Sequence, residues 1–279
     1  MGILVGEIYI AAMFATSSGA RIAYEVQGAA GGADVLLIHA GVNDRRSWEA
    51  VVRRLAPRYR CVAFDARGYG DTAYDREEGW SSVDDAIAVL DAADAKRAVV
   101  VGCSMSGQTA VDLALSHPER VAALVLIGAG IRGAPHELDG PDAALGAQIE
   151  AAESRGDFDE VARLDAWLWL DGAGANEGRV VGRPRELFVE MDRRALAADD
   201  PGLPAELEPA WPRLDQIAVP TLVLIGRLDA GYIRAIGESA ARLIAGARLQ
   251  WLEGVAHVPH LEEDPATLDA IATFLDEVA

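Results

Sequence analysis

Residues 98–107 read AVVVGCSMSG and decide the fold. The run begins with consecutive apolar residues, as expected for a strand buried on both faces of a parallel sheet. It then passes through Gly102 and Ser104 directly into a helical pattern that ends near Ser116. A serine between a strand and a helix lies at the helix N-terminus, where the macrodipole and free N–H groups favour a developing negative charge. Ser104 is therefore a candidate nucleophile, and an ordinary helix N-cap is the alternative interpretation.

The same alternation of apolar runs and helical patterns continues on both sides of this stretch. Strands are expected at residues 21–26, 34–39, 61–65, 98–102, 121–127, 220–226 and 248–252. Helices are expected at residues 48–55, 81–93, 104–116, 233–244 and 266–278. Strands that alternate with helices predict an α/β fold whose parallel strands are joined by right-handed crossovers.

The alternation breaks between the strand at 121–127 and the strand at 220–226. Helical patterns dominate there, at residues 143–153, 157–170 and 184–197, and Gly and Pro clusters separate them. The sequence therefore predicts a core domain made of residues 1–132 and 213–279. Residues 133–212 are predicted to form a helical cap inserted in this core.

Polar residues follow two later strands at their carboxyl ends, where open α/β sheets bind ligands. Asp229 follows the strand that ends near residue 226, and His257 follows the strand that ends at residue 252. A serine hydroxyl is a weak nucleophile at neutral pH and needs a base that an acid orients. We therefore expect Ser104 to act as nucleophile, His257 as base and Asp229 as acid. His260 is a competing base, and a buried core histidine is the alternative for either imidazole.

Four segments of the chain resemble one family. Residues 102–106 resemble the nucleophile elbow G-x-S-x-G of the α/β-hydrolase superfamily, with Ser106 in place of the second glycine. The order Ser, Asp, His is also that of this family, and residues 256–262 resemble the histidine loop of its cap-bearing members, in which the position of His260 is variable. The resemblance implies a mostly parallel, eight-stranded sheet flanked by helices, with an inserted helical cap.

A third match, FDARGYG at residues 64–70, resembles the D-x-R-G-x-G turn common in the same enzymes. Its glycines permit a tight return of the chain. We interpret Asp65 and Arg67 as structural partners and not as catalysts.

The family's oxyanion hole needs two N–H groups aimed at the oxygen that gains charge. The resemblance assigns one to Met105, the residue after the nucleophile. The other belongs to the loop HAGV that starts at His39 and resembles the family's H-G-x-P element, with Ala40 and Val42 replacing Gly and Pro. Gly41 is the expected second donor, and His39 is expected to brace the loop.

A serine nucleophile sets this chain apart from haloalkane dehalogenases and epoxide hydrolases of the fold, which use Asp. The expected reaction is hydrolysis of a small carboxylic ester or lactone through an acyl-enzyme, with no metal ion and no organic cofactor. The chain is loosely similar to 3-oxoadipate enol-lactonases and small carboxylesterases. Two alternatives stay open: a carbon–carbon bond hydrolase or cofactor-free oxygenase or lyase with the same triad, and a non-catalytic ligand-binding member.

The expected substrate pocket is formed by Trp167 and Trp169 in the cap, with Val42 and Val258 beside the site loops. Packing within the cap is the alternative role of the two tryptophans. An enol-lactone substrate carries a carboxylate and needs a cation in the pocket. The cap arginines could supply one, or they could be solvated surface residues: Arg179, Arg183, Arg185, Arg193 and Arg194. The acidic background favours a neutral ester or lactone.

Acidic residues outnumber basic ones by 44 to 25, for a formal charge of −19. Such a surface repels nucleic acid and anionic membranes, so a small molecule is the expected partner of a monomer or homodimer. Cys61 and Cys103 lie in apolar runs and are expected to be buried free thiols, typical of a cytoplasmic protein. Residues 1–14 either add an edge strand or extend a protein that starts at Met13.

Overall fold

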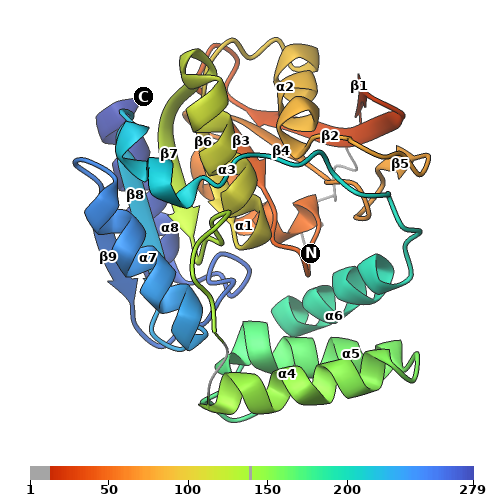
Figure 1. The fold of residues 1–279 in the computed structure, drawn as a ribbon. Helices are drawn as coiled ribbons and strands as arrows, with labels where there is room; N and C mark the ends of the chain where they lie inside the picture. Colours follow the sequence, from red (N-terminus) through yellow and green to blue (C-terminus); the bar gives the residue numbers. More distant parts are fainter. Residues whose placement is uncertain (1–12, 138–139) are drawn as a thin grey trace, which may run out of the picture.

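One mixed β-sheet forms the centre of the computed structural model, which describes residues 13–137 and 140–279 (Figure 1). The strand order is β1-β2-β4-β3-β6-β7-β8-β9, and β5 pairs with β2. The strands are β1 (Met13–Ser17), β2 (Ala20–Gly28), β3 (Asp34–Ile38), β4 (Arg60–Phe64), β5 (Ala73–Tyr74), β6 (Ala98–Cys103), β7 (Val121–Ile127), β8 (Thr221–Gly226) and β9 (Arg248–Leu252). All pairs from β4 to β9 are parallel, whereas β1, β2 and β5 pair in antiparallel fashion.

The mostly parallel sheet expected from the sequence is thus confirmed. The sequence did not predict the two-residue strand β5. It predicted β1 only as far as residue 14, although the strand continues to Ser17. Residues 13 and 14 do belong to an antiparallel edge strand, while residues 1–12 of the expected extension lie outside the described part of the chain.

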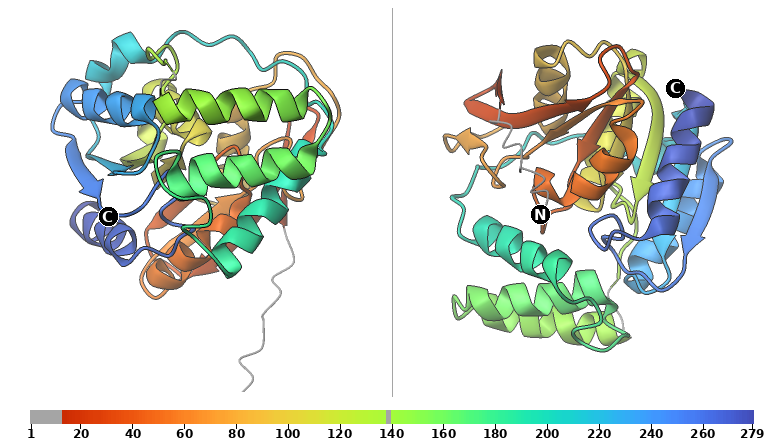
Figure 2. Two further views of the ribbon diagram at one scale, coloured as in Figure 1. Left: turned by 90° about the horizontal axis from the view of Figure 1, so that it is seen from below. Right: turned by 180° about the vertical axis from the view of Figure 1, so that it is seen from behind.

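Helices cover both faces of the sheet. The helices α2 (Ser82–Ala92), α3 (Met105–Ser116) and α7 (Gly231–Leu243) pack on one face, and α1 (Glu49–Leu55) and α8 (Pro265–Val278) pack on the other (Figure 2). Short 3₁₀ segments lie at Arg45–Trp48, Pro118–Arg120 and Trp211–Gln216. None of the helices within the described ranges combines the length and apolar character needed to cross a membrane.

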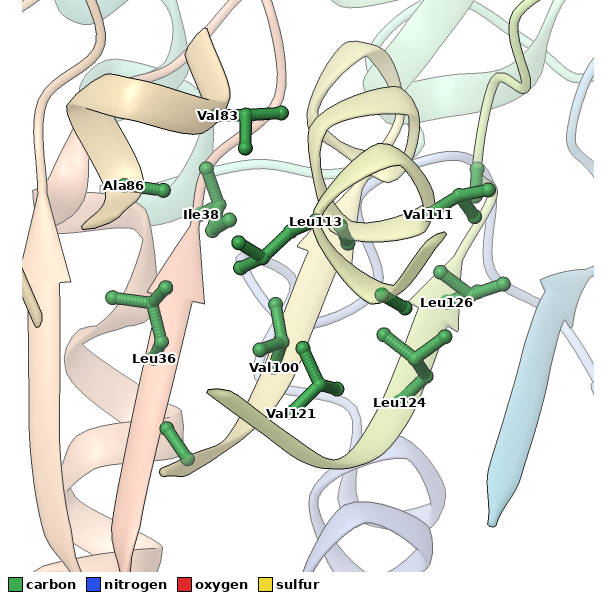
Figure 3. Packing of buried hydrophobic residues seen from close by; sticks show 14 of the residues in the cluster. Leu36, Ile38, Val83, Ala86, Val100, Val111, Leu113, Val121, Leu124 and Leu126 are labelled. Atoms are coloured by element: carbon green, nitrogen blue, oxygen red, sulfur yellow. The ribbon is translucent and has the colours of Figure 1, made fainter. Parts of the chain in front are cut away.

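The strand alternation divides the core in two. Leu36 and Val100 face α2 and α3, where they pack beside Leu113 (Figure 3). Their neighbours Leu37 and Val101 face α1 and α8. Because every second residue points to the opposite face, a strand buried on both sides must be apolar throughout.

A separate layer of helices lies across the carboxyl ends of the central strands (Figure 1). It contains α4 (Gly140–Glu153), α5 (Phe158–Asp165), a π-helical segment (Ala166–Gly172) and α6 (Arg183–Leu196). The stretch expected to be helical at residues 157–170 is helical, but it changes from an α-helix into a π-helix after Asp165. This layer has a small apolar core of its own, which includes Leu145, Val161 and Leu164. The division into core domain and cap at 133 and 212 stays a prediction.

The D-x-R-G-x-G turn is held by two buried ion pairs. Arg67 donates from Nε and Nη2 to the two carboxylate oxygens of Asp85, at 2.9 Å each. Asp65 pairs with Arg45 and accepts the backbone N–H of Asp71 at 2.8 Å. Asp65 and Arg67 therefore have structural roles, as expected. They are not bound to each other: Asp65 pairs with Arg45, and Arg67 pairs with Asp85.

Replacing Asp85 by alanine should lower the free energy of unfolding by about 3–5 kcal/mol, because it leaves a buried guanidinium without its partner. The remaining carboxylate, Glu77, lies 3.7 Å from Arg67. Asp91 on the same helix pairs with Arg120 and is a matched control, since its side chain is 63% exposed. Asp91→Ala should cost less than about 1 kcal/mol. Equal losses for the two variants in urea unfolding would contradict the prediction.

Candidate active site

Ser104 occupies a strained turn between β6 and α3. Its φ of 55° and ψ of −122° lie outside the regions that non-glycine residues ordinarily adopt. The turn also leaves no room for larger neighbours. A methyl carbon on Gly102 would lie 2.6 Å from the carbonyl oxygen of Ser106, and one on Gly107 would lie 2.3 Å from Cβ of Ala129. The close approach of strand and helix explains why small residues surround the serine.

Ser106 fills the place where the family pattern has glycine, and its hydroxyl has a specific partner. Oγ donates to the carbonyl oxygen of His39 at 2.6 Å, and both residues are buried. The hydroxyl therefore ties the elbow to the loop after β3.

The loop after β3 is braced by His39, as expected. Nε2 of His39 accepts the backbone N–H of Ala66 at 3.0 Å, so that Nδ1 carries the proton and donates to the carbonyl oxygen of Ala40 at 2.8 Å. Gly41 follows directly. A methyl carbon on Gly41 would lie 3.4 Å from Sδ and 3.6 Å from Cβ of Met105. Gly41 therefore lies against the side chain of Met105. The N–H of Met105, at the first position of α3, has no carbonyl partner within its helix.

Asp229 and His257 form a buried hydrogen-bonded pair. Nδ1 of His257 lies 2.9 Å and 3.0 Å from the two carboxylate oxygens of Asp229. The two residues are only 4% and 2% exposed, and Oδ1 of Asp229 also accepts the N–H of Ala230 at 2.7 Å. A proton on Nδ1 leaves Nε2 free to accept one. The pair can therefore orient His257 as a base.

The segment that carries Ser104 contacts the histidine loop. Sγ of the neighbouring Cys103 lies 3.7 Å from the carbonyl oxygen of His257. Within residues 13–137 and 140–279, however, no hydrogen bond joins the Ser104 hydroxyl to His257. Such bonds are often long without substrate and tighten only when it binds.

Two residues of the site were not singled out in the sequence. Gly128 directly follows β7 and has a φ of +49°. A methyl carbon there would lie 2.8 Å from Oδ2 of Asp229 and 2.9 Å from Nδ1 of His257. The hydroxyl of Tyr69 lies 3.8 Å from Sδ of Met105, and burial raises its pKa to about 12. Tyr69 fills the variable position of the D-x-R-G-x-G turn, so the motif gives its place but not its role.

The expected pocket residues have different surroundings. The Trp169 ring lies 4.7 Å from the imidazole of His257, tilted by 42°. Trp167 donates from Nε1 to the carbonyl oxygen of Ala175 and packs on the cap's own apolar core. Val42 and the fully buried Val258 pack on the core between the sheet, α1 and α8. Trp169 thus contacts His257, and the pocket roles of all four residues stay predictions.

Both cysteines are buried free thiols, as expected. Burial raises the pKa of Cys61 to about 12 and raises that of Cys103 far above its ordinary value. Since the thiolate is the reactive form, Cys103 is a poor alternative nucleophile.

His260, the competing base, is fully buried and stacks on Trp48 at 4.1 Å between ring centroids. Burial, followed by the neighbouring His257 and His39, lowers its pKa to about 3. Neither ring nitrogen has a hydrogen-bond partner among the described residues. Its contacts are those of a core residue.

Comparison with known proteins yields one family. The model of the alpha/beta hydrolase family matches residues 35–270. The chain is 36% identical to the 2-hydroxymuconate semialdehyde hydrolase of Pseudomonas sp. (strain CF600), over 88% of each chain. It is 28% identical to a pimeloyl-[acyl-carrier protein] methyl ester esterase of Pectobacterium carotovorum, over 91% of this chain and 98% of that one.

Among solved structures, the enol-lactonase of Burkholderia xenovorans LB400 superposes with a TM-score of 0.74 at 23% identity. The match covers 95% of this chain and all of the lactonase chain, and it shows a shared fold.

The neutral state of His260 can be tested by NMR. With a pKa near 3, its imidazole signals should stay constant between pH 5 and pH 8. The His260 signals are identified by their loss in a His260→Asn variant. Because the unfolded imidazole takes up its proton near pH 6.5, the folded state should also lose stability as pH falls below that value. A titration of His260 between pH 5 and pH 8 would contradict this assignment.

Proposed function

Because the chain belongs to the alpha/beta hydrolase family, we propose that it is a serine hydrolase that cleaves a small carboxylic ester or lactone. Ser104 is the nucleophile, His257 the base and Asp229 the acid. The proposal is supported above all by one arrangement. Ser104 is held in a strained strand-to-helix turn, its neighbour Cys103 contacts the backbone of His257, and Nδ1 of the buried His257 is bound to a carboxylate. A serine that only capped a helix would need neither the strain nor the pair.

The reaction follows from these positions. Nε2 of His257 takes the proton of the Ser104 hydroxyl as Oγ attacks the carbonyl carbon, and Asp229 stabilises the imidazolium. The N–H groups of Gly41 and Met105 hold the oxygen that becomes negative. His257 then gives its proton to the leaving alcohol, and an acyl-enzyme remains. Water, deprotonated by His257, releases the acid and restores Ser104.

A neutral substrate fits the charges around the site. Four cap arginines are bound to carboxylates: Arg179 to Glu262, Arg185 to Asp171, Arg193 to Asp159 and Arg194 to Asp71. The fifth, Arg183, is exposed. Since these guanidiniums are already paired or face solvent, they offer little to a substrate carboxylate.

A second candidate is a hydrolase of carbon–carbon bonds with the same triad. It is favoured by the 36% identity to a hydrolase whose named substrate is a semialdehyde and not an ester. The two candidates share Ser104, His257 and Asp229 and differ only in what the cap admits.

The first test is hydrolysis of p-nitrophenyl acetate and butyrate at neutral pH without added metal. The wild type should be active, and Ser104→Ala should abolish turnover without changing the circular dichroism spectrum or the unfolding midpoint. Equal activity of Ser104→Ala would exclude Ser104 as the nucleophile. Activity on a vinylogous 1,5-diketone but on no ester would favour the carbon–carbon hydrolase.

Variants of the acid and the two histidines separate their roles. Asp229→Asn should lower kcat by about 10⁴-fold, because the amide favours the wrong tautomer of His257. His257→Ala should be as inactive as Ser104→Ala, whereas His260→Ala should keep most of the activity of whatever fraction folds. If His260→Ala were the inactive variant and His257→Ala active, the assignment of the base would be wrong.

A further inference from the structure

Two acidic side chains of the cap lie against each other. Asp165 is the last residue of α5 and Asp192 lies within α6, and they are 8% and 2% exposed. Each carboxyl group acts on the pKa of the other, so the two lie close together. Like charges held close together in a buried site disfavour ionisation of both groups, which favours the state in which one of the two is protonated.

Within residues 13–137 and 140–279, neither acid of the pair forms an ion pair. Arg193 and Arg194 follow Asp192 in sequence, but they bind Asp159 and Asp71 instead. No donor among the described residues reaches Oδ2 of Asp192. A buried oxygen without a donor favours the neutral acid, which can donate its own proton.

Other charged or titratable groups face the pair from three directions. The negative charge of Glu153, at the end of α4, raises the pKa of both carboxyl groups. Tyr69 faces Asp192 from the loop after β4. The backbone of Asp44 contacts Met191 at 3.4 Å, but its carboxylate is bound to Arg46. Burial first, and then the charges of Asp165 and Glu153, raise the pKa of Asp192. Burial and the charge of Glu153 raise the pKa of Asp165, and the bond from Trp169 opposes this rise.

Trp169 connects the carboxyl pair to the base of the site. Its indole Nε1 donates to Oδ1 of Asp165 at 3.2 Å. Its carbonyl oxygen accepts the backbone N–H of His257 at 3.1 Å, and its ring lies 4.7 Å from the imidazole. Asp165 therefore fixes the position of the indole ring. The indole ring in turn restricts where the imidazole of His257 can lie.

We propose that Asp165 and Asp192 share one proton and, by fixing Trp169, position His257 for catalysis. The inference rests on the proposed serine hydrolase function. Both acids are positioning residues, since they act on His257 through Trp169. When the shared proton is lost, the two negative charges repel each other, the contact between α5 and α6 loosens, and the indole no longer holds the imidazole in place.

The first experiment compares pH profiles of kcat and KM for p-nitrophenyl butyrate between pH 6 and pH 9.5, corrected for spontaneous hydrolysis. For the wild type, kcat should fall toward the alkaline end of this range, by up to tenfold per pH unit, with little change in KM. Asp192→Asn should lose this alkaline decline, because its amide N–H donates to Asp165 at every pH. The same decline in Asp192→Asn as in the wild type would overturn the proposal.

Asp159→Asn is the matched control. Asp159 lies on α5 with a side chain that is 80% exposed, and it binds Arg193. This variant should follow the wild-type profile. If it lost the alkaline decline as well, the effect would come from the general charge of the cap and the proposal would be overturned.

A second measurement does not depend on turnover. The indole ¹H–¹⁵N signal of Trp169, one of six tryptophans, is identified by its loss in Trp169→Phe. It should titrate between pH 6 and pH 9.5 in the wild type and stay constant in Asp192→Asn. An indole signal that does not move in the wild type overturns the pair, whereas a titrating signal without ester cleavage leaves the pair standing and refutes only the proposed function.

Trp169→Phe covers the case in which Asp192→Asn fails to fold. This variant keeps both carboxyls and the backbone bond to His257 but lacks the indole donor. Its kcat at pH 7 should fall about tenfold with KM nearly unchanged, and the alkaline decline should disappear. An unchanged kcat would overturn the positioning role.

Discussion

The left-handed turn at Ser104 depends on close contact between segments that are far apart in the chain. A non-glycine residue in such a conformation costs about 1–3 kcal/mol and persists only where its surroundings fix it. Here the N–H of Ser104 donates to the carbonyl oxygen of Ile127 at 3.0 Å, and its carbonyl oxygen accepts N–H groups of Gly107 and Gly130, both at 2.9 Å. The turn is therefore held by the end of β7 and the loop after it. Neither β6 nor α3 could hold it alone.

The sequence predicts the parts of this arrangement that depend on local pattern. The strands β3, β6, β7 and β8 are recognisable because burial on both faces requires unbroken apolar runs. Ser104 can be placed at the edge of the sheet because it directly follows β6. Asp229 and His257 lie a few residues after the ends of β8 and β9. Because the carboxyl ends of parallel strands lie at the same edge of the sheet, the three residues are expected to lie at that edge.

Features that arise from contacts between distant segments escaped prediction. The strand β5 has two residues and exists only because Ala73 and Tyr74 pair with β2. The π-helical segment interrupts a run whose apolar spacing is compatible with one regular helix, and no glycine or proline marks the change before residue 172. The role of Gly128 follows from its closeness to His257, a residue more than a hundred positions away.

The histidine loop is bound to the helical layer that contains α4, α5 and α6 as well as to the core. Arg179 donates to the carbonyl oxygens of Gly254 and Leu170 and to the carboxylate of Glu262, which in turn accepts the N–H of Ala256 at 3.0 Å. Together with the bond from His257 to Trp169, these contacts hold both sides of the imidazole loop against the helical layer. Because Asp229 binds Nδ1 and the helical layer contacts the backbone and ring face of the same residue, a movement of that layer would displace His257.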